Sequence, residues 1–135
     1  MSQFIYLLDT NIISDLVRNP AGKITEKIKE VGEDKVCTNL IIASELQYGA
    51  YKKQSARLTK QLNAILSAIE ILPIESDTDK EYAKLRVYLE QKGTPIGPND
   101  MFIAAHALAK NLILITANID EFKRVPGLMI ENWLD

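Results

Sequence analysis

The chain has 135 residues, 47% hydrophobic and 25% charged, which fits one domain spanning residues 1–135 around a single core. The formal net charge of −2 excludes a broadly basic surface of the kind that attracts nucleic acid. No apolar stretch approaches the ~20 residues that cross a bilayer, and the start lacks the basic flank of a signal peptide, so we expect a cytoplasmic protein.

The first part of the chain predicts a buried strand followed by two short helices. Residues 4–8 form an apolar run, and the Asp-Thr-Asn segment at 9–11 has short polar side chains that favour a turn and a helix N-cap. A short helix is therefore expected at 12–17. Apolar residues spaced four and three apart then predict a second helix at 23–31.

A second strand and its helix follow. The run at 36–38, rich in β-branched residues, predicts another buried strand. Within it, Cys37 is expected to be a small core residue, because a single cysteine has no internal disulfide partner. Asn39 is a candidate cap for a helix at 40–51, and residues 57–68 predict a further helix with one apolar face.

The remaining segments continue the alternation. An apolar segment at 69–74 predicts a strand interrupted near its end by Pro73, and Ser76 or Asp77 is expected to cap a helix that runs to Gln91. The elements expected after it are a Gly/Pro loop at 92–98, a helix at 99–110 with Pro98 in its first turn, a strand at 112–116, a short helix around 120–123 and a strand at 128–130.

This alternation predicts an α/β fold. The strands are continuously apolar, which is typical of a parallel sheet covered on both faces. We therefore expect a three-layer α/β/α sandwich with a central, mostly parallel sheet. In such sheets, ligands bind beyond the carboxyl ends of the strands. Asp9 follows the first strand, and the Thr-Ala-Asn segment at 116–118 follows the strand at 112–116.

Three carboxylates are expected to converge at that edge. Asp9 ends the first strand, although a helix cap alone would also explain it. Glu45 and Asp100 each have apolar residues one helical turn away, which places both beside the inward faces of their helices. An ionised carboxylate taken out of water costs several kcal/mol unless it is paired or binds a metal ion. No arginine is obviously placed to neutralise the three acids, so we expect a Mg²⁺ or Mn²⁺ site.

An acidic site with a divalent cation favours hydrolysis of phosphodiester bonds, because the cation polarises phosphate and activates water. His106, the only histidine, follows Asp100 by six residues and faces away from it along the helix. A histidine-based nuclease is therefore not expected, and His106 is predicted to be partly buried or at the surface. Local basic clusters at 52–60 and 123–124 are candidate RNA contacts, although such clusters are more often ordinary solvated surface.

Short motifs occur in a specific order along the chain, and they are Leu8-Asp9-Thr10-Asn11, Ser44-Glu45-Leu46 with Tyr48-Gly49, Pro98-Asn99-Asp100, Ile115-Thr116-Ala117-Asn118 and the ending Glu131-Asn132-Trp133. Each motif is weak by itself. In this order they resemble the VapC toxins of the PIN-domain family, and the similarity extends over essentially the whole chain.

This resemblance implies an endoribonuclease that acts on structured RNA, forms a homodimer and is neutralised by a cognate VapB-like antitoxin. Carried over by motif, Asp9, Glu45 and Asp100 are the metal-binding and catalytic acids. The loop at 93–100 resembles the branch that cuts initiator tRNA, which makes the tRNA anticodon stem-loop the leading substrate. The other residues expected in the site are Asn118 in catalysis and Asn11, Thr116 and Glu121 in the pocket.

One position departs from the common family pattern. Asn118 stands where many PIN domains have an aspartate, and its carbonyl oxygen adds no charge to a metal site. A second firmly bound ion would therefore need Asp120 or Glu121 to turn inward, and Glu121 is the better candidate. The number of ions, the RNA target and the cut position stay open.

Two other functional classes share part of this pattern. A receiver domain or a haloacid-dehalogenase-like phosphatase also has an acidic mouth that binds Mg²⁺. A receiver expects an extra acidic pair beside the first strand, and the phosphatase expects a second aspartate where Asn11 stands. A non-catalytic binding module would keep the fold for dimerisation or for holding a partner protein, but the intact Asp9, Glu45 and Asp100 argue against it.

Overall fold

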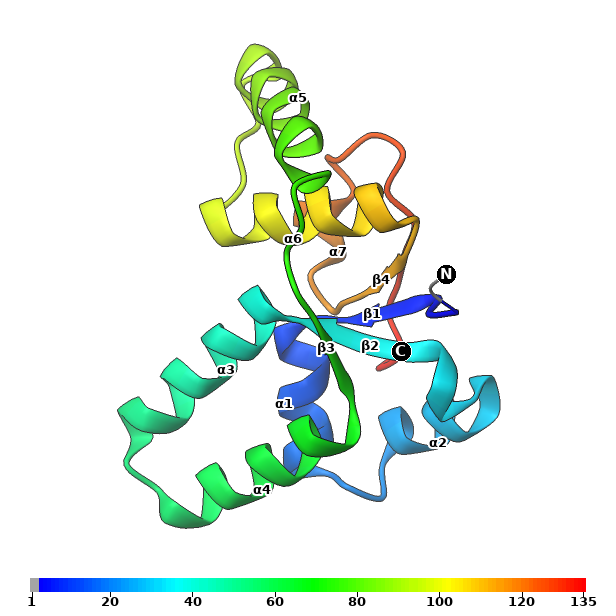
Figure 1. Cartoon of the computed structure of the whole chain (residues 1–135), viewed down its shortest axis with the longest axis vertical. Helices are drawn as coiled ribbons and strands as arrows, with labels where there is room; N and C mark the ends of the chain where they lie inside the picture. The colour runs from blue at the N-terminus through cyan, green and yellow to red at the C-terminus, as the bar shows by residue number, and fades with distance from the viewer. Residues whose placement is uncertain (1–2) are drawn as a thin grey trace.

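The computed structural model describes residues 3–135, and a five-stranded parallel sheet lies at its centre (Figure 1). The strands are β1 Tyr6–Leu8, β2 Val36–Asn39, β3 Glu70–Leu72, β4 Ile113–Ile115 and β5 Ile130–Glu131. Their order across the sheet is β3-β2-β1-β4-β5, and every neighbouring pair is parallel. Because β1 is central, Leu7 pairs with Cys37 on one side and with Leu114 on the other.

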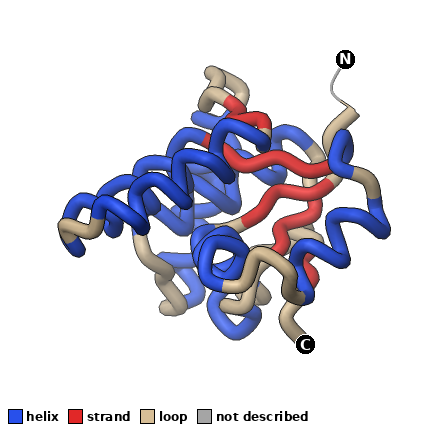
Figure 2. Tube along the Cα trace, turned by 90° about the horizontal axis from the view of Figure 1, so that it is seen from below, coloured by secondary structure: helices blue, strands red, loops and turns tan. Residues whose placement is uncertain are grey.

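Helices connect the strands and cover both faces of the sheet. They are α1 Thr10–Arg18, α2 Lys23–Val31, α3 Leu40–Lys53, α4 Ala56–Ala68, α5 Thr78–Lys92, α6 Pro98–Lys110 and α7 Ile119–Phe122, with a short 3-10 helix at Glu33–Lys35. In Figure 1, α1, α2 and α4 lie on one side of the sheet, and α5, α6 and α7 lie on the other. Figure 2 shows the strands side by side between these helices. The expected three-layer sandwich is confirmed.

The inner strands are apolar on both faces because both faces are covered. Leu7, Leu8, Leu114 and Ile115 have no exposed surface. Burial of each such side chain contributes about 1.5–3 kcal/mol to folding. Cys37 is also fully buried, and burial raises the pKa of its thiol to about 12, so it is a core residue and not a nucleophile. No helix within residues 3–135 is both long and apolar enough to cross a membrane.

One predicted strand bound is wrong, and one predicted helix cap is confirmed in position but not in its hydrogen bond. The last strand begins at Ile130 and not at residue 128, because Leu128 still belongs to the turn and its backbone nitrogen donates to the Val125 carbonyl. Asp77 occupies the N-cap position of α5 but makes no cap hydrogen bond to the helix. The Asp77 backbone is already helical (φ −69°, ψ −16°), whereas a capping residue is usually extended. Its carboxylate lies 3.0 Å from the ammonium of Lys110, at the end of α6.

Candidate active site

Asp9 is positioned by two elements at once. It follows β1 in the middle of the sheet and is the N-cap of α1, with only 3% of its surface exposed. One carboxylate oxygen accepts from the Thr10 backbone nitrogen at 2.8 Å, and the other accepts from the Thr116 hydroxyl at 2.8 Å. Burial raises the pKa of Asp9, and the charges of Glu45 and Glu121 add to the rise, while these hydrogen bonds oppose it.

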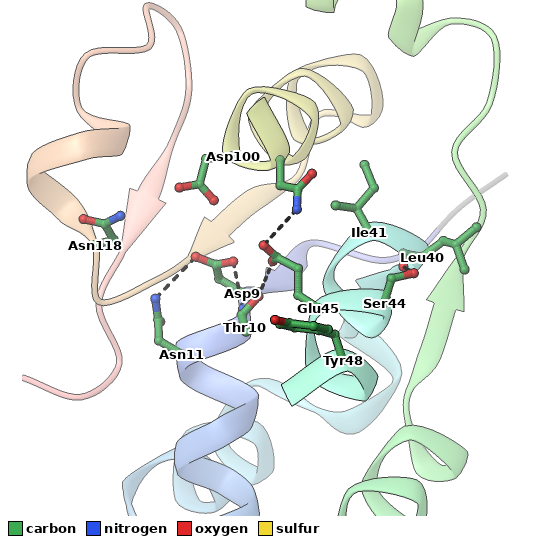
Figure 3. A pocket seen from close by; sticks show the side chains of 11 residues that line it. Asp9, Thr10, Asn11, Leu40, Ile41, Ser44, Glu45, Tyr48, Asp100 and Asn118 are labelled. Atoms are coloured by element: carbon green, nitrogen blue, oxygen red, sulfur yellow. Dashed lines mark hydrogen bonds between the residues drawn. The ribbon is translucent and has the colours of Figure 1, made fainter. Parts of the chain in front are cut away.

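Glu45 reaches the same place from α3. That helix begins where the Asn39 side chain accepts a hydrogen bond from the Ile42 nitrogen at 2.9 Å, as the cap prediction expected. One oxygen of Glu45 accepts from the Thr10 hydroxyl at 2.7 Å, and the other accepts from the Asn99 amide at 3.3 Å (Figure 3). Both oxygens are therefore held by polar groups from other helices.

Asp100 comes from the first turn of α6, which begins at Pro98. It is partly buried, and burial is the main cause that raises the pKa of its carboxyl to about 7. A hydrogen bond with Glu121 and the charges of Glu121, Asp9 and Glu45 raise this pKa further. The charges of Asp9, Glu45 and Glu121 are thus close enough to disfavour ionisation of Asp100.

Glu121 lies beside Asp100 and behaves in the opposite way. Burial would raise the pKa of Glu121, but hydrogen bonds from the Gly97 backbone nitrogen, Asp100 and the Asn118 amide, with the charge of Arg124, lower it. The Gly97 nitrogen donates to one oxygen at 3.0 Å, and the Asn118 amide donates to the other. Within this pair, Asp100 therefore holds the proton and Glu121 the negative charge.

The acids face one cavity of about 790 Å³, within the usual range for ligand pockets of about 300–1,000 Å³. Figure 3 shows Asp9, Glu45 and Asp100 pointing into the same space from three separate elements. Asn11 and Asn118 also line the cavity, so five of the predicted site residues meet there. In the part of the chain that the structure describes, no Lys or Arg lines it.

Thr116 and Glu121, which were predicted to line the pocket, do not border the cavity itself. Thr116 is fully buried beneath Asp9, where its hydroxyl also accepts from the Asn118 backbone nitrogen at 3.0 Å. Glu121 is held away from the cavity by its bonds to Gly97 and Asn118. Both residues contact site side chains and do not face the open space.

The loop after β4 is tied to the site from the other side. The Asn11 side-chain oxygen accepts from the Ala117 backbone nitrogen at 2.9 Å, which joins α1 to this loop. Asp120, the alternative to Glu121, is exposed and forms an ion pair with Lys123 at 3.2 Å. Of the two candidate acids, Glu121 is the one directed toward Asp100.

The sequence prediction missed Thr10, Asn99 and Tyr48 as site residues. Thr10 and Asn99 hold the two oxygens of Glu45, and Tyr48 lines the cavity. A signal was present, because Thr10 and Asn99 are direct neighbours of Asp9 and Asp100 in the sequence. A polar residue adjacent to a candidate ligand is a reasonable guess for a group that orients another ligand.

His106 takes no part in the cavity. The predicted partial exposure is wrong, since the side chain is fully buried where α6 packs on the sheet. Its Nδ1 lies 3.0 Å from the Asn39 side-chain nitrogen, whereas its Nε2 has no hydrogen-bond partner among residues 3–135. Burial lowers the pKa of His106, and the nearby charge of Lys110 lowers it further. It is a neutral core residue.

The donor set suits a hydrated, hard cation. Within residues 3–135, no three His, Cys, Asp or Glu side chains are close enough together to enclose an ion. The acids instead surround an open cavity, and Mg²⁺ commonly binds through one or two carboxylates while keeping several waters. The raised pKa of Asp100 and the lack of a lining cation in the described chain both favour a positive ligand there.

The sequence matches known proteins over most of its length. Residues 6–128 match the model of the PIN domain. Ribonuclease VapC2 of Rickettsia felis is 39% identical over 131 residues, covering 96% of this chain and 98% of that protein. The tRNA(fMet)-specific endonuclease VapC of Salmonella typhimurium is 33% identical over 129 residues, covering 95% and 97%.

Solved structures agree with the sequence comparison. The crystal structure of VapBC2 from Rickettsia felis bound to a promoter DNA fragment matches with a TM-score of 0.89 and 38% identity, covering 96% of this chain and 99% of that chain. VapBC-1 from nontypeable Haemophilus influenzae matches with a TM-score of 0.87 and 32% identity, covering 98% of this chain and 100% of that chain.

Ribonucleases with a PIN domain generally depend on a divalent metal ion. With its acidic cavity at the carboxyl end of a parallel sheet, this chain belongs to the PIN-domain family, among the VapC ribonucleases.

Proposed function

We propose that this chain is a Mg²⁺-dependent endoribonuclease and the toxin component of a type II toxin-antitoxin system. The observation that supports this most directly is the meeting of Asp9, Glu45 and Asp100 in one cavity that no Lys or Arg lines in the described residues. An uncompensated group of carboxylates costs folding free energy, which a catalytic cation would offset.

Asp9, Glu45 and Asp100 would hold the cation, with Asn118 as a neutral oxygen donor beside them. A bound Mg²⁺, or Mn²⁺ in its place, supplies polarisation of the scissile phosphate and a water of lowered pKa. Asp100 must lose its proton to serve as a ligand, so metal affinity should rise as the pH increases through about 7.

The polar neighbours of the acids set the geometry before any ligand binds. Thr10 and Asn99 fix the two oxygens of Glu45, and Thr116 fixes the inner oxygen of Asp9. Ligand carboxylates that are already hydrogen-bonded need less reorganisation when they bind. These three residues are positioning residues, because they act through the acids.

The proposed substrate is structured RNA, with the tRNA anticodon stem-loop as the leading candidate. One relative, from Salmonella typhimurium, is named a tRNA(fMet)-specific endonuclease. Unpaired loops are the usual targets of sequence-specific RNA recognition, because their bases are accessible. The chain would act in the cytoplasm as a homodimer. A VapB-like antitoxin would neutralise it, since the similar solved structures include VapBC assemblies.

The deciding experiment is cleavage of total tRNA by the antitoxin-free protein in Mg²⁺, in Mn²⁺ and in EDTA, with the new 5′ and 3′ ends mapped by sequencing. We expect discrete cuts in Mg²⁺ or Mn²⁺ and none in EDTA. An Asp9→Asn variant should not cut, because the change replaces a negatively charged carboxylate ligand with a neutral amide.

Two results would contradict the proposal. Cuts that persist in EDTA or in Asp9→Asn would show that the acidic cavity is not the catalytic site. A protein that leaves both tRNA and ribosomal RNA whole in Mg²⁺ and Mn²⁺, while still binding its antitoxin, would favour the non-catalytic binding module.

A further inference from the structure

One wall of the acidic cavity is a strip along α3. Leu40, Ser44, Tyr48 and Lys52 are spaced by four residues, so they lie on one face of the helix. The first three line the cavity, and Lys52 continues the same face one turn beyond it. Leu40 is 55% exposed and Tyr48 is 67% exposed, so this face is open along most of its length.

Tyr48 is the unusual member of this strip. It stands one helical turn after Glu45, and in Figure 3 its ring lies below Glu45 at the edge of the cavity. Among the described residues, it is the one aromatic side chain that lines the cavity. A ring that is two-thirds exposed contributes little to the core, so its place beside a cluster of acids needs another explanation.

The charges around the cavity indicate what Tyr48 would bind. The cavity wall itself has acids and no Lys or Arg in the described chain. The proposed cation would serve the scissile phosphate, so side-chain cations for the flanking phosphates must come from outside the cavity. Lys52 supplies such a charge, since its ammonium lies 5.9 Å from the centre of the Tyr48 ring. Lys53 adds a second charge at the same end of α3. Aromatic rings beside basic residues are the usual platform for unpaired bases.

We propose that Tyr48 stacks on an unpaired RNA base next to the scissile phosphodiester, and that Lys52 contacts a neighbouring phosphate. This inference rests on the proposed ribonuclease function and adds a substrate-binding residue to it. A base held on Tyr48 would set which phosphodiester lies over Asp9, Glu45 and Asp100. The strip therefore contributes to the choice of the cut position.

The chain contains a matched control for this pair. On α5, Lys92 lies 5.7 Å from the centre of the Tyr88 ring, which is the same Tyr–Lys spacing of four residues. Tyr88 is also partly exposed, at 37%, but it does not line the acidic cavity. The two pairs share local chemistry and differ in position, so Tyr88→Ala measures the general effect of losing a surface ring.

The test uses an RNA hairpin that contains a cut site already mapped with the wild-type protein, and a set of hairpins that each carry one abasic nucleotide at a different position beside that site. We expect Tyr48→Ala to lower kcat/KM on the intact hairpin by about 10-fold or more, the size typical of losing one base–aromatic stack. Tyr48→Phe should stay within about twofold of wild type, since the stacking face is kept. Lys52→Gln should lower the salt dependence of binding by about one counterion.

The abasic hairpin separates stacking from other roles. At one abasic position, the wild-type protein should lose about as much activity as Tyr48→Ala loses on intact RNA. Tyr48→Ala should lose little further activity on that abasic hairpin, because the stack is already absent. Tyr88→Ala should cut like wild type, and Tyr48→Ala should keep the wild-type Tm because its ring is exposed.

The proposal is wrong if Tyr48→Ala cuts the intact hairpin at the wild-type rate while Asp9→Asn does not, and the ribonuclease function would then still stand. It is also wrong if the losses from Tyr48→Ala and from every abasic position are fully additive. Tyr48→Ala that weakens only antitoxin binding would assign the strip to the protein partner. If wild type cuts no RNA, the proposed function itself has failed.

Discussion

The two ends of α6 each lie beside carboxylates, but only the C-terminal end supplies a cation for them. There the Lys110 ammonium lies 2.6 Å from Glu75 and 3.0 Å from Asp77, and its hydrogen bond is the main cause that lowers the pKa of Asp77. At the N-terminal end, burial and neighbouring carboxylates raise the pKa of Asp100 to about 7. Within residues 3–135, no ion pair involves Asp100 or the acids that share its cavity.

The difference shows which group of acids serves the fold and which is kept for a ligand. Carboxylates paired with a lysine of the same chain are stabilised in the folded state without any ligand. Carboxylates that raise one another's pKa cost folding free energy, and such groups concentrate at functional sites. Changes at the two ends of α6 should therefore affect activity and stability in opposite ways.

The largest expected effect comes from Asp100→Asn. This change removes a ligand charge, so RNA cleavage should fall by more than about 100-fold, beyond the range usual for residues that only support a ligand. Above about pH 7, where Asp100 is ionised, the Tm of the metal-free protein should stay the same or rise, because the change relieves repulsion with the neighbouring carboxylates. Cleavage assays measure the loss of activity, and thermal denaturation measures the Tm. Asp77→Asn is the control, and it should keep its activity. Cleavage by Asp100→Asn at the wild-type rate would contradict the comparison.

Mg²⁺ should stabilise the protein through one end of α6 only. A ligand at 100 times its Kd adds about 2.7 kcal/mol to the free energy of unfolding. We expect thermal denaturation to show a rise in Tm with Mg²⁺ in wild type and in Lys110→Met, and none in Asp100→Asn. An equal rise in all three proteins would place the cation elsewhere.

The pH dependence of stability provides a third test, in metal-free buffer. The pKa of Asp100 rises from 3.8 to about 7 on folding, so the native state keeps a proton that the unfolded chain has released. This carboxyl favours folding fully below pH 3.8, and its contribution is lost as the pH rises to about 7. The Tm of wild type should therefore fall across this window by on the order of 5 °C more than that of Asp100→Asn. Identical profiles would show that Asp100 ionises normally.

Lys110→Met should have the smallest effect. Glu75 and Asp77 have 60% and 49% of their side chains exposed, so water replaces the lost cation and the Tm should fall by no more than about 3 °C. RNA cleavage should not change, because the carboxylates at the other end of α6 keep their surroundings. A tenfold loss of cleavage in Lys110→Met would show that the two ends are coupled through the helix.

Local patterns were sufficient for much of the fold. The apolar runs predicted the inner strands, and helical spacing predicted α2 at its observed bounds of Lys23–Val31. The same patterns placed Asp9 after a strand, and Glu45 and Asp100 on the inward faces of their helices. These features depend on neighbours within one or two turns, which is why hydrophobic periodicity alone reveals them.

The tertiary structure decided which groups meet. Thr116 donates to Asp9 from 107 residues away, and Asn99 donates to Glu45 from 54 residues away, so neither bond is visible in local sequence. Asp9 and Asp77 both precede a helix, yet Asp9 caps its helix and lines the cavity, whereas Asp77 binds Lys110. The sequence thus determined the residue types and their faces. The strand order β3-β2-β1-β4-β5 brought them together, because packing between distant segments sets those distances.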